Sequence, residues 1–264
     1  MAVLQFKFDE SFDHQIMVVG GWIASELEWQ RLEASWQRRI NRENSRSGPE
    51  QQISRFHATE MNCKSGEFKH WEHKRCVQLS KKLIHMLVRR TMGAIATGCN
   101  MDAIQQVWPK GDVTTLKRRS YVVSMKAMMV DLAHIMEDYF PGDRVHIIHD
   151  QGNWDDAALE GYNLMISDPE WKLKHVFDGI EAKSGKDASA IGLQAADMIA
   201  YEVFKGIKKK TISKDAEMRA VMKEFIKKEV PMSARWIDLK AAQALYRTMK
   251  DSGKYPDLDN HGVA

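Results

Sequence analysis

Segments with the two-residue period of a β-strand alternate with segments of helical period along most of this 264-residue chain. Residues 4–10 place Leu4, Phe6 and Phe8 on one face and polar side chains on the other, which predicts a strand. An Ile- and Val-rich segment at 15–24 predicts a second strand, so the chain is expected to open with a β-hairpin. Further strands are predicted at 92–101, 145–150 and 175–182. A hairpin followed by alternating helices and strands predicts an α/β fold in which helices cover a mixed sheet.

Helical patterns fill the intervals between these strands and the C-terminal part of the chain. The first predicted helix begins after Ser25, a suitable N-cap with Glu28 as its capping-box partner, and ends near Asn44. The other predicted helices cover residues 68–90, 115–139, 154–167, 191–207, 214–229 and 237–250. We expect residues 1–210 to form the main domain and residues 211–264 to form a helical extension packed on it.

The composition favours a soluble, cytoplasmic globular protein. The longest uncharged apolar stretch, 16–24, is far shorter than the roughly 20 residues that a membrane-spanning helix requires. The N-terminal residues lack the basic and apolar regions of a secretory signal. Three cysteines with no C-x-x-C pair argue against a disulfide framework and for a reducing compartment. We therefore expect no membrane association.

Positive charge is concentrated in two segments, although the net charge is only +3. Residues 69–90 carry seven Lys or Arg against one acid, and residues 205–228 carry nine against three. Clustered cations bind phosphates by releasing counterions, so the two segments predict a nucleic-acid partner. The alternative is that they are ordinary solvated helix faces.

One acidic residue lies within a nearly all-apolar helical segment, 191–207. Asp197 is the only charged residue between Asp187 and Glu202. At helical spacing it shares a face with Leu193, Ala196, Ala200, Tyr201 and Phe204. Burying a carboxylate there costs on the order of several kcal/mol without a compensating partner. Asp197 is therefore either a functional residue or half of a buried pair with an Arg or a backbone group.

Acidic residues also end two of the predicted strands. Asp150 ends the apolar strand at 145–150, and ligand sites of α/β sheets gather at such strand ends. The alternative is that Asp150 only opens the turn at 150–153. Asp9 and Glu10 end the first strand in the same way. Carboxylates brought together do not all remain ionised without a cation, and ligation by oxygen alone suits Mg²⁺ or Mn²⁺.

A fourth candidate element is the sequence from His57 to Glu60. These two residues are three apart, so they share one face of a helical turn and could supply a metal ligand and a proton-transfer group. The alternative is a helix start with exposed polar residues. Zinc is not expected, because no cysteine stands at ligand spacing from the histidines considered, which are His57, His70, His73, His146 and His149. The G-x-S-x-G, P-loop and G-x-G-x-x-G motifs are absent from the sequence.

Three segments together resemble a known family. They are Phe8-Asp9-Glu10-Ser11 with the following Gly20-Gly21 strand, Phe56-His57-Ala58-Thr59-Glu60, and Lys183-Ser184 with Leu193-Gln194-Ala195-Ala196-Asp197-Met198-Ile199-Ala200-Tyr201. The chain resembles the family numbered 3800 among domains of unknown function (DUF3800), which is grouped with the ribonuclease H-like superfamily. Phe12 stands where typical members carry a glycine.

The resemblance implies a mixed central sheet whose acidic residues bind two divalent cations and cleave phosphodiesters. Asp9, Asp150 and Asp197 resemble the acids of the first strand, the fourth strand and the late helix. Glu60 is the best match to the remaining acid, which lies on a helix, and Glu10 is an alternative. One cation of such a site activates the attacking water, and the other stabilises the leaving oxygen.

We therefore expect a Mg²⁺- or Mn²⁺-dependent nuclease or phosphodiesterase. The three aspartates, with Glu10 as an alternative, would be metal ligands, and Glu60 would be a fourth ligand or would orient the water. His57 would shuttle a proton, and Lys183 would contact the phosphate. Segments 69–90 and 205–228 would hold the nucleic-acid backbone. The alternative is a catalytically inactive ribonuclease H-like module that binds nucleic acid or a partner protein.

Overall fold

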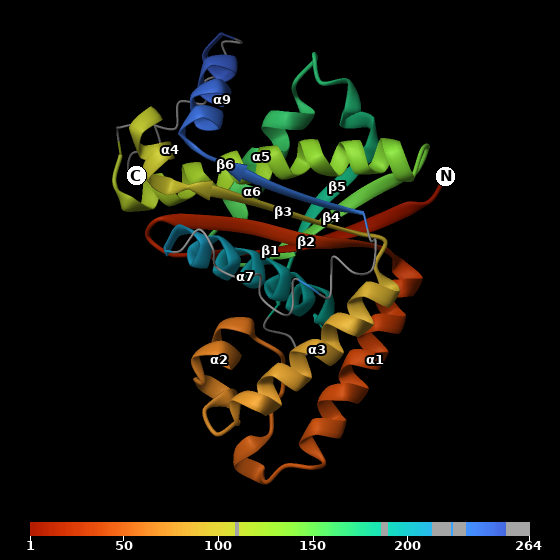
Figure 1. Cartoon of the computed structure of the whole chain (residues 1–264). Helices are drawn as coiled ribbons and strands as arrows, with labels where there is room; N and C mark the ends of the chain where they lie inside the picture. The colour runs from red at the N-terminus through yellow and green to blue at the C-terminus, as the bar shows by residue number, and fades with distance from the viewer. Residues whose placement is uncertain (109–110, 186–189, 213–222, 224–230, 252–264) are drawn as a thin grey trace.

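The computed structural model describes residues 1–108, 111–185, 190–212, 223 and 231–251 (Figure 1). Six strands form one sheet in the order β5-β4-β1-β2-β3-β6. The strands are β1 (Val3–Phe12), β2 (Ile16–Ser25), β3 (Gly93–Asn100), β4 (Arg144–Asp150), β5 (Phe177–Lys183) and β6 (Met232–Ile237). None of the helices in these ranges is long and apolar enough to cross a membrane.

The strand directions define the class of fold. β2 is antiparallel to both β1 and β3, whereas β4 is parallel to β1 and to β5. β6 lies parallel to β3 at the other edge. An antiparallel three-strand meander that continues into parallel strands on the β1 side is the ribonuclease H-like arrangement, so the predicted mixed α/β fold is confirmed.

Helices cover both faces of the sheet (Figure 1). One face carries α4 (Met101–Val107), α5 (Val113–Tyr139), α6 (Asp155–Ile166) and α9 (Leu239–Asp251). The opposite face carries α1 (Glu26–Asn44), α2 (Ala58–Cys63), α3 (His73–Arg90) and α7 (Ile191–Ile212). The sheet therefore separates two hydrophobic cores.

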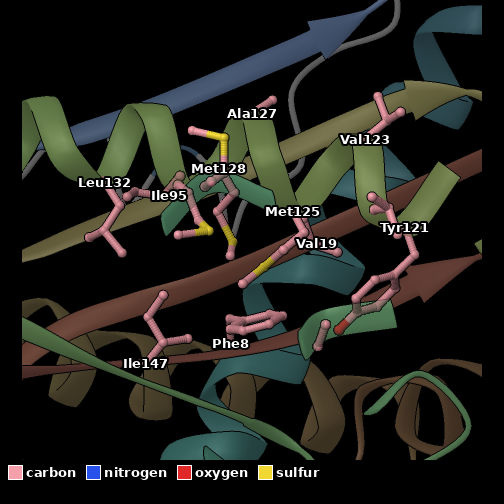
Figure 2. Close-up of a cluster of buried hydrophobic side chains, with 14 of the residues drawn as sticks. Phe8, Val19, Ile95, Tyr121, Val123, Met125, Ala127, Met128, Leu132 and Ile147 are labelled. Carbon is pink, nitrogen blue, oxygen red and sulfur yellow. The ribbon is translucent and has the colours of Figure 1, made fainter. Parts of the chain in front are cut away.

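The core beneath α5 follows from the alternation of β1. Phe6 and Phe8 are fully buried on this face, and Figure 2 shows Phe8 among side chains of the neighbouring strands and of α5. Since successive strand residues point to opposite faces, Lys7 and Asp9 face the α7 side. The hydrophobic pattern of β1 thus directs Asp9 toward the helix that carries Asp197.

Two adjacent glycines in β2 allow close packing on both faces of the sheet. A Cβ atom at Gly20 would lie 3.3 Å from the Cα atom of Ala200 in α7. A Cβ atom at Gly21 would lie 2.3 Å from the carbonyl oxygen of Lys7 and 2.7 Å from the Cβ atom of Phe8. Because Gly20 is paired with Asp9, the close approach of α7 occurs beside that carboxylate.

Most predicted elements are present with shifted ends. The Oγ atom of Ser25 accepts a hydrogen bond from the backbone N–H of Glu28 at 3.3 Å, as expected for the N-cap of α1. β1 continues to Phe12, so the turn follows it instead of beginning at Ser11. The helix predicted at 68–90 begins only at His73, because Gly66–Phe68 forms a separate 3-10 turn.

The C-terminal region contains a strand that was not predicted. β6 has no clean alternation, and it is a strand because it pairs with the edge of β3. The short helix α4 was also not predicted, whereas the helix predicted at 237–250 is present as α9. The helix predicted at 214–229 lies outside the described residues, except for Lys223.

Candidate metal-binding and catalytic site

Three predicted acidic residues come from neighbouring parts of the fold. Asp9 on β1 and Asp150 at the end of β4 lie on parallel strands, each one residue beyond the paired Phe8 and His149. Asp197 lies on α7, which packs across this face of the sheet, and is 9% exposed. Asp9 and Glu10 lie within β1 and do not end it as expected, because β1 stays paired with β2 up to Phe12. The interior of β1, the end of β4 and one helix thus bring together residues that are far apart in the sequence.

The pKa of Asp9 shows how close these charges are. Burial raises the pKa of Asp9 well above its usual range, and the negative charges of Glu10, Asp197 and Asp150 raise it further. The backbone N–H of Glu10 donates a hydrogen bond to Asp9 Oδ1 at 2.8 Å, which acts in the opposite direction. We call Asp9, Glu10, Asp150 and Asp197 the carboxylate cluster.

Glu10 has an unusual protonation equilibrium. Burial raises the pKa of Glu10 from 4.5 to about 7, and the charges of Asp150 and Asp197 act in the same direction. A hydrogen bond with Asp9 opposes this rise. Glu10 therefore exchanges its proton near neutral pH.

Asp197 also has a structural role. Its Oδ2 atom accepts a hydrogen bond from the backbone N–H of Ala58 at 2.7 Å, at the start of α2. One turn earlier on α7, Gln194 Oε1 accepts a hydrogen bond from the backbone N–H of Phe56 at 2.9 Å. Burial raises the pKa of Asp197, whereas His57, the Ala58 N–H and Arg55 lower it. Asp197 thus joins the 56–58 segment to the cluster.

Asp150 is held by the chain that follows β5. Its Oδ1 atom accepts a hydrogen bond from the backbone N–H of Gly185 at 2.5 Å. Lys183 is the strand partner of Asp150, and its Nζ atom lies 2.7 Å from Oε1 of Glu181. Lys183, the side chain predicted to contact the phosphate, therefore lies on the strand next to Asp150 and is paired with Glu181.

His57 and Glu60 belong to α2 and its cap. His57 is the N-cap, and its Nδ1 atom accepts a hydrogen bond from the backbone N–H of Glu60 at 3.3 Å. Glu60 Oε1 lies 3.8 Å from Arg55 Nη2, and its Oε2 atom accepts a hydrogen bond from the N–H of Glu67 at 3.4 Å. Glu60 is not among the charges that raise the pKa of Asp9. The structure therefore places His57 beside Asp197, and it places Glu60 beside Arg55.

The donor set of the cluster suits a hard divalent cation, because it consists of carboxylate oxygens alone. Its charges are also poorly compensated, as the raised pKa values of Asp9 and Asp197 show. In the described part of the chain, no three His, Cys, Asp or Glu side chains converge tightly enough to hold an ion as they stand. Asp9, Asp150 and Asp197 each have one oxygen hydrogen-bonded to a backbone N–H. The residues thus fit the chemistry of Mg²⁺ or Mn²⁺, and joint ligation requires their side chains to turn inward.

Positive charge gathers at the far end of α1, on the same side of the sheet as α7. We call Arg39, Arg42, Arg46 and Lys82 the basic patch. Burial lowers the pKa of Lys82, and the three arginines lower it further, which shows that the four cations are neighbours. A cavity of about 550 Å³ beside them is lined by Arg39, Lys82 and His85, among others. The α1 arginines thus add to the basic segment predicted at 69–90.

The second basic segment is described only as far as Ile212, apart from Lys223. There, Lys208 Nζ lies 2.7 Å from Asp13 Oδ2 in the β1–β2 turn. Lys205 Nζ lies 5.3 Å from the ring centre of Tyr201. Lys208 therefore attaches the end of α7 to the β1–β2 turn, whereas Lys205 contacts a residue of its own helix.

Sequence reasoning missed three residues of this site. Arg55 directly precedes the Phe56–Glu60 segment, so its charge was a usable signal. Gln194 lies in the apolar helix and could have been noticed as a second polar residue on α7. Tyr121 belongs to the apolar pattern of α5 and gave no signal, yet burial and then the charges of Glu10 and Asp9 raise its pKa.

The fold and the acidic site define a ribonuclease H-like α/β protein with a carboxylate cluster where the end of β4 lies beside β1 and α7. No protein-family model matches the chain, and a search of curated proteins finds no similar sequence.

Proposed function

We propose that this protein is a Mg²⁺- or Mn²⁺-dependent nuclease or phosphodiesterase. The observation that carries the proposal is the gathering of four carboxylates from β1, β4 and α7, whose charges raise the pKa values of Asp9 and Glu10. Like charges buried together are best compensated by a cation. The resemblance of three segments to the family numbered 3800 supports the same assignment.

Asp9, Asp150 and Asp197 would hold the metal, with Glu10 as a further ligand. A bound divalent ion would supply a nucleophilic hydroxide from water and would compensate charge on the phosphate oxygens. The backbone hydrogen bonds to Asp150 and Asp197 would keep one oxygen of each carboxylate in place while the other turns toward the ion. Glu60 would orient the water or complete the ligand set after leaving Arg55.

His57 is suited to proton transfer at its Nε2 atom. Because Nδ1 accepts the Glu60 N–H, the neutral imidazole carries its proton on Nε2. His57 also lies near enough to Asp197 for its charge to lower the pKa of that carboxyl. We infer that the imidazolium form of His57, in which Nδ1 gives up the Glu60 N–H, donates its Nε2 proton to the leaving oxygen and returns to the neutral ring.

The cations around the cluster provide contacts for a polyanionic substrate. Lys183 lies on the strand beside Asp150, and exchanging Glu181 for a phosphate would place its charge next to the reaction. Arg55 could do the same from the α2 side. The basic patch would bind more distant phosphates of the nucleic acid, because it lies on the same side of the sheet.

A second reading is a catalytically inactive module that binds nucleic acid or a partner protein. It is favoured by the backbone hydrogen bonds that occupy one oxygen each of Asp9, Asp150 and Asp197. In this reading the carboxylates only brace loops and α2. The two readings differ in whether the protein responds to divalent metal.

The deciding experiment is thermal melting during Mn²⁺ and Mg²⁺ titration of wild type and Asp197→Asn. Asn retains an oxygen that accepts the Ala58 N–H, so the variant removes the charge and keeps α2 docked. Binding to the folded state alone raises stability by about 2.7 kcal/mol at a metal concentration of 100 Kd. We expect a rise in melting temperature for wild type and little or none for Asp197→Asn.

Asp102→Asn is the matched control, because Asp102 is exposed at the start of α4 on the other face of the sheet. It should keep the full metal response. Cleavage of single-stranded DNA and RNA with Mn²⁺ should then be lost in both Asp150→Asn and Asp197→Asn. Full cleavage by the variant that combines Asp150→Asn with Asp197→Asn, or no metal response in wild type, would reject the enzyme reading.

A further inference from the structure

A second cavity, of about 500 Å³, lies beside the carboxylate cluster on the same face of the sheet. Trp29, Ile148 and Leu193, each almost fully buried, lie beneath its floor, and its polar part includes Gln5, Gln30 and Gln151. These residues come from α1, β1, β4 and its following loop, and α7. Its volume is within the range of small-molecule sites, roughly 300–1,000 Å³.

The cavity begins two residues away from the cluster on two strands. Lys7 and its strand partner Ile148 line the cavity, and Asp9 and Asp150 follow each of them by two positions. Two strand residues span about 6.6 Å. Leu193 precedes Asp197 by about one helical turn on α7. A group in the cavity would therefore adjoin a phosphate held at the cluster.

The lining does not favour a phosphate in the cavity itself, because its cations are already paired. Lys7 Nζ lies 3.0 Å from Glu33 Oε1 and 4.7 Å from the ring centre of Trp29. Lys183 is paired with Glu181 at 2.7 Å, and the phosphate at the cluster would draw it away from the cavity. Glu26 adds a further negative charge to the lining. The occupant should accordingly be a polar but uncharged group.

The glutamine amides supply the hydrogen bonds that such a group needs. Each amide offers donors and an acceptor, the combination that pairs with the edge of a nucleobase. Within the described residues, the side-chain amides of Gln5 and Gln151 make no hydrogen bond to the protein. The amide of Gln30 makes only a long one, of 3.4 Å, to Glu26.

We propose that this cavity binds one nucleobase of the substrate strand beside the cleavage site, which makes Gln5 and Gln151 specificity-determining residues. This inference rests on the proposed function. The base enters over the apolar floor, its edge faces the amides, and its own phosphate lies toward the carboxylate cluster.

The test measures binding of two fluorescent hexanucleotides without divalent metal, each prepared as DNA and as RNA. One carries its bases, and the other has the same phosphates with abasic sugars throughout. We expect wild type to bind the base-containing strand more tightly. Gln5→Ala and Gln151→Ala should each weaken that binding about three- to tenfold, the value of one hydrogen bond, and should leave abasic binding unchanged.

Gln37→Ala is the matched control, because Gln37 lies on α1 outside the cavity and pairs with Asn41. It should change neither affinity, and melting curves verify that all variants are folded. Equal binding of the two strands by wild type, or equal losses on both strands in the variants, would overturn the inference. Competition by nucleoside monophosphates at the concentration of the strand would assign the cavity to free nucleotides and overturn its assignment to the strand.

The melting experiment with Mn²⁺ separates the two claims. A metal response that depends on Asp197, together with binding that is independent of bases, would overturn the nucleobase cavity alone. Base-dependent binding without any metal response would overturn the nuclease and leave a nucleic-acid-binding module.

Discussion

Single residues of the cluster keep their protons to a higher pH than ordinary carboxyls do. Burial is the largest cause of the raised pKa of Asp9, Glu10 and Asp197, and mutual repulsion adds to it for each of them. The native state therefore binds protons that the unfolded chain releases at lower pH. A cation bound at the cluster would replace those protons and compensate the same negative charges.

Glu10 predicts a measurable dependence of stability on pH. Its pKa is about 7 in the folded protein and 4.5 ordinarily, so between these values the folded state binds more protons than the unfolded state. Its contribution to the free energy of unfolding is fully present below pH 4.5 and is lost as the pH rises toward 7. In metal-free urea unfolding, wild type should lose stability relative to Glu10→Gln over this interval, by on the order of 1 kcal/mol or more.

The comparison with Glu10→Gln is needed because His149 has the opposite effect. Burial lowers the pKa of His149 below its ordinary value of 6.5. The contribution of His149 to the free energy of unfolding therefore increases as the pH rises to that value. This effect is common to both proteins and cancels in the difference. Parallel pH profiles for wild type and Glu10→Gln would contradict the assignment.

Among the elements, β2 packs closely against α7 on one face and against side chains of β1 on the other. Gly20 admits the backbone of α7 on one face, and Gly21 admits Phe6 and Phe8 on the other. Because Asp9 is paired with Gly20, this packing also sets the separation between β1 and the helix that carries Asp197.

Gly21→Ala should be strongly destabilising, because the new Cβ atom would lie 2.3 Å from the backbone oxygen of Lys7. We expect a loss of about 3 kcal/mol in urea unfolding, at the upper end for overpacking. Gly20→Ala should cost less, about 1 kcal/mol, because its nearest contact is 3.3 Å. Gly206→Ala, with no atom within 4 Å of the added Cβ, should instead stabilise α7 by about 0.5–1 kcal/mol. A neutral Gly21→Ala would show that β1 and β2 can separate at no cost.

Across the whole molecule, the three aspartates of the carboxylate cluster and the basic patch share one side of the sheet. Figure 1 shows α1, α2 and α3 projecting from the face that α7 covers. A strand that contacts the patch and reaches the cluster would therefore follow one continuous side of the protein.

The basic patch should determine how nucleic-acid binding depends on salt. Each phosphate contact to a single strand contributes about 0.7 to the slope of log affinity against log salt. We expect the double variant Arg42→Gln with Arg46→Gln to reduce that slope by about 1.4 in fluorescence anisotropy at several NaCl concentrations. Lys240→Gln, on an exposed position of the opposite face, should leave it unchanged. An unaltered slope in the double variant would remove the patch from the binding surface.

Much of the architecture could be predicted from local pattern alone. The alternation of Leu4, Phe6 and Phe8 predicts both the first strand and the face that Asp9 occupies. β6 could not be predicted, because its half-exposed residues have no clean period and it becomes a strand by pairing with β3. Asp197 could be singled out because a charge in an apolar helix is costly, whereas Tyr121 has no comparable signature.

The sequence by itself determined the mixed α/β fold and the three aspartates as candidates, since periodicity and isolated charge are local properties. Only the tertiary structure decided that Asp197 also accepts a hydrogen bond from the Ala58 N–H, that Glu60 contacts Arg55, and that a glutamine-lined cavity adjoins the cluster. These relations join residues from separate elements. They depend on strand register and on the approach of α7 to the sheet, which no single segment encodes.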